Sequence, residues 1–115
     1  MIVSMLAATA LQVAGAHVET PYPADMQRAE ICYAHVMILI EDAARETGRV
    51  AGPSWFIREW WGARLTDEQS TDDREARVKT AVMQRRIRDA DGFAEEHTDC
   101  IQEAIKAGAV PVMTP

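Results

Sequence analysis

The sequence lacks the short motifs by which many enzyme sites are recognised. It contains no glycine-rich phosphate loop, no Gly-x-Ser-x-Gly nucleophile motif and no His-Glu-x-x-His pair. Those motifs position phosphates, nucleophilic serines and catalytic zinc. Adjacent acidic residues such as Glu95 and Glu96 project in different directions from a helix, so they do not form a pair of catalytic carboxylates. We therefore expect no catalytic residue and no cofactor, and a protein that is not an enzyme.

Positive charge and long apolar runs are also scarce. The chain has 12 Lys and Arg against 18 Asp and Glu, a net charge of −6. Such a chain is repelled by the phosphates of nucleic acids and by anionic lipids. Its N-terminal stretch of small residues, 1–16, is shorter than the roughly 20 apolar residues that cross a bilayer. We expect no nucleic-acid partner and no stable membrane span, and we predict that the partner is another protein.

Residues 1–16 nevertheless resemble a secretory signal peptide. They carry no charged side chain and end in the small-x-small pattern Ala14-Gly15-Ala16, which a signal peptidase accepts. The basic residues that usually precede the apolar part are missing, and the alternative is an ordinary N-terminal helix packed into the fold. We predict a cleaved signal and an exported protein, either periplasmic or secreted.

Sustained strand alternation and internal repeats are absent, whereas helical spacing of apolar residues recurs along the chain. Proline after position 20 and glycine or proline at positions 48, 53, 92 and 108 mark the expected helix boundaries. The sequence therefore predicts one all-α domain, residues 17–115, built as a small bundle of three or four helices. The expected helices span about 24–47, 53–65, 71–90 and 93–107. The last two can also form a single bent helix.

Two of these helices carry informative apolar patterns. The run from Val36 to Ile40 is apolar on nearly all sides, which predicts a central helix with neighbours on more than one face. In the third helix, Thr80, Met83 and Ile87 continue an apolar face, and Val78 and Val82 widen it.

The only two cysteines each lie three positions from a histidine, in the mirrored motifs Cys32-x-x-His35 and His97-x-x-Cys100. If the first and last helices run antiparallel, all four side chains come together. Cysteines in an oxidising compartment tend to pair. We therefore predict a Cys32–Cys100 disulfide between antiparallel first and last helices, and no metal site.

A metal site is the alternative interpretation of the same motifs. A tetrahedral ion such as zinc would take Cys32, His35, His97 and Cys100 as ligands. The cysteines, however, are 68 positions apart, unlike those of the usual Cys2His2 pattern. With a disulfide formed, the two histidines either lie partly exposed at the edge of the core or stack beside the disulfide and titrate near neutrality.

All three tryptophans fall within residues 55–61. Tryptophan, phenylalanine and arginine dominate binding hot spots, and Trp55 and Trp60 are offset by about 140° around a helix. One helix therefore cannot bury every ring, and at least one is expected at the surface. The alternatives are core packing, with Phe56 and Trp60 on the buried face, and a membrane-interface role. The candidate partner-binding residues are Trp55, Phe56, Trp60 and Trp61.

These observations predict a small exported helical protein that acts as a binding or structural module with a disulfide-stapled core. The alternative function is an exported metal-binding protein with a Cys2His2 cluster.

Overall fold

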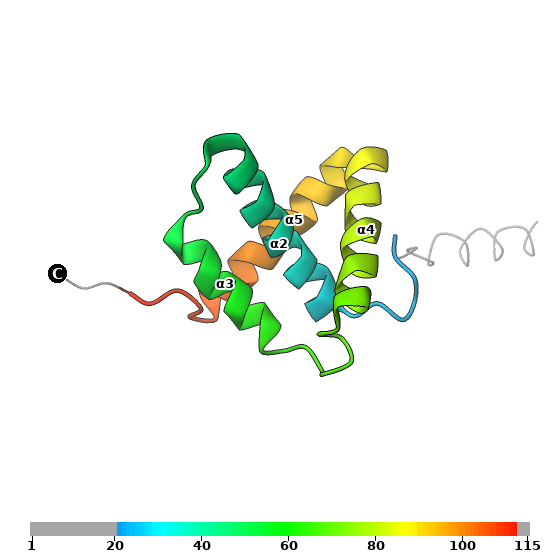
Figure 1. Ribbon diagram of the computed structural model, residues 1–115, viewed down its shortest axis with the longest axis horizontal. Coiled ribbons are helices and arrows are strands. Elements are labelled where there is room, and N and C mark those ends of the chain that lie inside the picture. The colour runs from blue at the N-terminus through cyan, green and yellow to red at the C-terminus, as the bar shows by residue number, and fades with distance from the viewer. Residues whose placement is uncertain (1–20, 113–115) are drawn as a thin grey trace, which may run out of the picture.

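The computed structural model describes residues 21–112, and within this range every regular element is a helix. The elements are α2 (Arg28–Thr47), α3 (Gly52–Gly62), α4 (Asp72–Arg88) and α5 (Ala90–Lys106) (Figure 1). The prediction of a small all-α bundle is confirmed. The predicted signal segment, 1–16, lies outside the described residues.

Helix α2 is the centre of the bundle and contacts each of the other three helices. Its two sides bury separate apolar clusters, as the run from Val36 to Ile40 predicted. Cys32, Val36 and Ile40 face α3 and α5 in one cluster. Ala34 and Ile38 face α4 and the start of α5 in the other. Helix α2 is therefore packed against apolar side chains on both sides.

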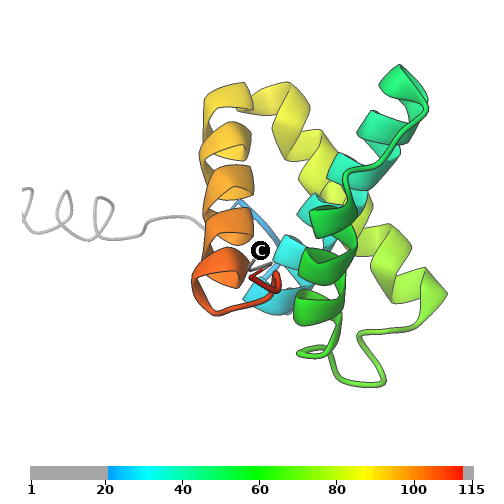
Figure 2. The ribbon, with the colours of Figure 1, turned by 90° about the vertical axis from the view of Figure 1, so that its left-hand side faces the viewer.

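The first and last described helices, α2 and α5, run in opposite directions, and the view in Figure 2 shows them inclined to each other. Three residue pairs fix their register: Arg28 with Glu103, Cys32 with Cys100, and His35 with His97. Along these three pairs the residue number increases in α2 and decreases in α5, so the predicted antiparallel arrangement is confirmed. Helices α3 and α4 both pack on α2 but not on each other, and they lie on either side of it in Figure 1.

Helix boundaries differ from the prediction where side chains cap the chain. Helix α2 begins at Arg28 rather than near residue 24, because the carboxylate of Glu30 accepts a hydrogen bond from the backbone N–H of Gln27 at 2.9 Å. Helices α4 and α5 are separate, and the break falls at Asp89. The Asp89 carboxylate accepts from the backbone N–H of Gly92 at 3.0 Å. A Cβ at position 92 would lie 2.1 Å from that carboxylate, so this glycine permits the cap.

The apolar face expected for the third helix is partly wrong. Val78 and Val82 are fully buried, whereas Ile87 is 82% exposed and Met83 and Thr80 are also exposed. The inward face of α4 is completed instead by Arg74 and Arg85, whose long side chains enter polar contacts with α2 and α5. No helix in residues 21–112 combines the length and the apolar character needed to cross a membrane.

Candidate functional site

The predicted disulfide joins α2 to α5. Cys32 and Cys100 have no exposed surface, and their Cα atoms are 5.2 Å apart. The indole N–H of Trp61 donates to the carbonyl oxygen of Cys100 at 3.0 Å, which ties α3 to the same point. Since both sulfur atoms are bonded to each other, neither is a thiolate ligand. The alternative four-ligand metal site is therefore incompatible with this arrangement.

The two histidines contact each other next to the disulfide. Nδ1 of His35 lies 2.9 Å from Nδ1 of His97, and the two rings meet edge to face. Phe93 packs against both rings, with centroid distances of 4.8 Å to His35 and 5.4 Å to His97. His35 is completely buried, so the expectation of two partly exposed histidines is wrong for this residue. His97 is only partly buried.

A single carboxylate organises the polar groups around this pair. Oε1 of Glu96 accepts from Nε2 of His35 at 2.7 Å and from the Tyr22 hydroxyl, while Oε2 accepts from Nη1 of Arg85 at 2.8 Å. Burial alone would raise the pKa of Glu96, but the hydrogen bonds from His35 and Tyr22 and the charges of His35 and Arg85 hold it below its usual value. Burial, followed by the hydrogen bond to this carboxylate, raises the pKa of Tyr22. The carboxylate is therefore charged and fully satisfied.

His97 does not titrate near neutrality, which one alternative proposed for the pair. Burial, reinforced by the neighbouring charge of His35, lowers the pKa of His97 to about 4. The charge of Arg86 lowers it further, and Asp42 opposes both with a smaller effect. His97 is therefore neutral at physiological pH. The sequence correctly predicted that the two rings meet, but it did not reveal the burial that lowers the pKa of His97.

The aromatic residues of α3 divide between the core and the surface. Trp61 and Ile57 are buried against α2 and α5, whereas Trp55 is 47% exposed and Phe56 is 44% exposed. Trp60 is partly buried at the edge of the same cluster. The face proposed for core packing is thus shifted by one residue, from Phe56 to Ile57. Trp61 is excluded from any accessible contact surface.

Arginine side chains accompany the outward aromatic rings. The guanidinium carbon of Arg58 lies 6.0 Å from the Trp55 ring centroid, and that of Arg64 lies 3.3 Å from the Trp60 centroid. Arg58 also donates to the sulfur of Met37 on α2 at 3.3 Å. Such cation–π pairs hold the rings in place while leaving part of each exposed. We call the exposed Trp55 and Phe56, together with the partly buried Trp60, the aromatic face of α3.

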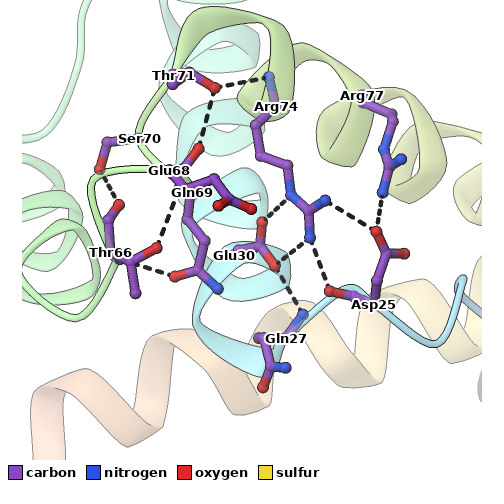
Figure 3. A network of polar contacts seen from close by, with 10 residues as sticks. All are labelled: Asp25, Gln27, Glu30, Thr66, Glu68, Gln69, Ser70, Thr71, Arg74 and Arg77. Carbon is purple, nitrogen blue, oxygen red and sulfur yellow. Dashed lines mark hydrogen bonds and ion pairs between the residues drawn. The ribbon is translucent and has the colours of Figure 1, made fainter.

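A second polar network, which the sequence did not indicate, joins α2 to α4 (Figure 3). Glu30 is only 3% exposed, and Oε1 of its carboxylate accepts from Nε of Arg74 at 2.5 Å. Arg74 also reaches the carboxylate and the carbonyl oxygen of Asp25, at 2.9 and 2.8 Å. Arg77 adds an outer ion pair to Asp25 at 2.5 Å. The Gln27-x-x-Glu30 spacing signals the helix cap, but nothing in it identifies Arg74 as the partner.

A groove lies between α2, α4 and the connection that precedes α4. It has a volume of about 200 Å³ and is partly open to solvent, with side chains of α2 as its floor and those of α4 and the connection as its walls. Its lining includes Tyr33, Met37, Leu65, Asp72, Glu75 and Ala76. No sequence pattern specified this hollow.

Comparison with known proteins yields no relative. No protein-family model, no curated protein and no solved structure matches the chain significantly. Within residues 21–112, no three His, Cys, Asp or Glu side chains are placed to hold a metal ion. The features of this chain that can support a function are the aromatic face of α3, the groove and the disulfide.

Proposed function

We propose that this chain is an exported helical interaction module that binds another protein through the aromatic face of α3. The observation that supports it is the exposure of Trp55 and Phe56, at 47% and 44%, on one regular helix. Large rings with few rotatable bonds supply much contact area at a low entropic cost, which is why they dominate binding hot spots. Neighbouring arginines add the other residue type that is enriched there.

The buried side of α3 fixes the position of this helix, which favours a preorganised contact surface. On the opposite side of α3, Ile57 and Trp61 are buried in the cluster that contains the disulfide. Trp61 is also hydrogen-bonded to the backbone of Cys100. A helix held in this way presents its outer rings without further ordering, so less free energy is lost on binding.

We also propose that the chain is exported. A disulfide persists in oxidising compartments and is rare in the cytosol, and the predicted signal at 1–16 would deliver the chain there. An intact mass measured without reductant tests both parts. The proposal expects a chain that begins at His17 and is about 2 Da lighter than its reduced form, because a disulfide lacks two hydrogens.

The same spectrum tests the alternative, an exported metal-binding protein. Free thiols together with one equivalent of bound metal would favour that function instead. An intact disulfide would remove its thiolate ligands.

The binding proposal is tested by crosslinking in the cell of origin. A photo-reactive phenylalanine analogue replaces Trp55 in one variant and Ile87, which is 82% exposed on α4, in the control. We expect a discrete crosslinked product from position 55 and none from position 87. The alanine variants Trp55→Ala and Phe56→Ala should weaken capture of that product's partner, while Ile87→Ala should not. Equal crosslinking from both positions, or unchanged capture by the alanine variants, would overturn the proposal.

A further inference from the structure

The groove between α2 and α4 has an apolar interior. Its floor is formed by Tyr33, Ala34 and Met37 of α2, and its sides by Leu65, Ala76 and Val78. The volume of this partly open groove, about 200 Å³, is larger than the roughly 150 Å³ of a cavity that binds benzene in a well-studied protein. A phenyl ring or a short branched alkyl group therefore fits inside it.

Charged groups border this interior, and most of them are already neutralised. Glu30 is paired with Arg74, and Lys79 is paired with Glu41 at 2.8 Å. Each of these two ion pairs is neutral as a whole.

Two carboxylates at the rim differ from the others. Asp72 and Glu75 line the groove from the first turn of α4, and within residues 21–112 neither has an ion-pairing partner. Burial raises the pKa of Glu75, as does the charge of Asp72, and the charge of Arg58 offsets part of this rise. The rim thus carries two carboxylates without an ion-pairing partner beside apolar surface.

We propose that this groove binds a small molecule in which an apolar group of about the size of a phenyl ring carries a protonated primary amine. The apolar group displaces water from the surface of Tyr33 and Met37. The ammonium group donates to the carboxylates of Glu75 and Asp72, whose partial burial strengthens the interaction relative to one in bulk water. The groove shares no residue with the aromatic face of α3, so the two proposals fail independently.

The probe that separates charge from shape is 2-phenylethylamine, compared with the neutral 2-phenylethanol and the anionic 3-phenylpropionate. Binding to the full chain is measured by titration calorimetry and by amide chemical shifts of groove residues. A charge-assisted hydrogen bond corresponds to about a tenfold or larger difference in Kd. We expect the amine to bind about tenfold more tightly than the alcohol, and the propionate not to bind.

Two variants test separately whether the charged rim and the apolar interior of the groove contribute to binding. Glu75→Gln should weaken amine binding about tenfold and leave alcohol binding unchanged. The matched control is Glu95→Gln, which removes an exposed carboxylate of α5 that does not line the groove. Ala76→Leu fills the groove from an exposed helix position and should abolish binding of both compounds. Unchanged helical circular dichroism and an intact disulfide show that each variant is folded.

Three results would overturn this inference. The first is equal binding of the amine and the alcohol. The second is the same loss of amine binding in Glu75→Gln and Glu95→Gln. The third is the absence of binding by either compound to the folded wild-type chain.

Discussion

Nδ1 of His35 lies 2.9 Å from Nδ1 of His97 across the interface between α2 and α5. A hydrogen bond between two nitrogen atoms needs one proton, so one Nδ1 donates and the other accepts. The carboxylate of Glu96 only accepts, and Nε2 of His35 therefore carries a proton towards it. Protonation of both rings would place a proton on each Nδ1 atom and remove the contact between them.

The histidine contact predicts a loss of stability in mild acid. The pKa of His97 is about 4 in the folded chain and 6.5 without the fold's influence. Between these values the unfolded chain binds a proton that the folded chain does not, so stability is complete above about pH 6.5 and falls towards pH 4. After allowance for the partial exposure of His97, the loss is on the order of 2 kcal/mol. Urea unfolding at a series of pH values measures it.

The matching control is His97→Gln, which keeps a side chain able to donate and accept but cannot titrate. Its stability should change much less between about pH 6.5 and pH 4. The further loss below this range should remain, because the lowered pKa of Glu96 belongs to a different group. A wild-type chain whose stability is flat between those two pH values would contradict the interpretation.

Removing the disulfide should destabilise the bundle strongly. Cys32 and Cys100 are 68 positions apart, and a crosslink over a loop of that size stabilises a fold by about 4 kcal/mol in the chain-entropy model. The double variant Cys32→Ala/Cys100→Ala and the wild type under reductant should lose similar amounts in chemical unfolding. A change of less than about 1 kcal/mol in both would show that the reduced chain keeps the same constraint by packing alone.

The ion pairs of α4 should differ sharply in their importance. Arg74→Met leaves the buried carboxylate of Glu30 without its partner, and breaking a buried pair costs about 3 kcal/mol or more. Arg77→Met removes only an exposed ion pair with Asp25, which is worth less than about 1 kcal/mol. Thermal and urea unfolding of the two variants test the contrast. Equal losses would mean that Glu30 is rehydrated when Arg74 is absent.

Two tryptophans of α3 should respond differently to the same substitution. Trp61→Phe removes the hydrogen bond to the carbonyl oxygen of Cys100 and leaves space in the core, at a cost of about 2 kcal/mol. Trp55→Phe changes an exposed ring and should alter stability by less than about 0.5 kcal/mol. If Trp55→Phe proved the more costly change, the burial of this helix would be assigned to the wrong face.

The contact between the first and last helices was predictable because it is indicated by residue types that occur only two or three times in the chain. Two cysteines with flanking histidines in mirrored order admit one simple antiparallel register, and the structure has it. The run from Val36 to Ile40 likewise predicted a helix with neighbours on several sides. Both signals depend on residue types that are usually buried, namely cysteine and large aliphatic residues.

Other parts of the fold depend on polar contacts, which the periodicity of apolar residues does not predict. The inward face of α4 includes Arg74 and Arg85, because each finds a carboxylate on another helix. An apolar pattern assigns such residues to solvent, and it assigns Ile87 to the core although that residue is exposed. The groove is further still from prediction, since its lining combines residues of α2, of α4 and of the connection before α4.

The disulfide described above also determines what happens to a chain that has been cut. The covalent ring from Cys32 to Cys100 contains all of α3 and α4 and the connection of residues 63–71, most of which is exposed. A single cleavage in that connection opens the ring without releasing a fragment, because both pieces stay bonded through sulfur. The two pieces also keep their packing, because α2 on one side of the cut contacts both α4 and α5 on the other. A protease would convert this protein into a nicked two-chain form that is heavier by one water molecule, and only reduction would break the covalent link between its parts.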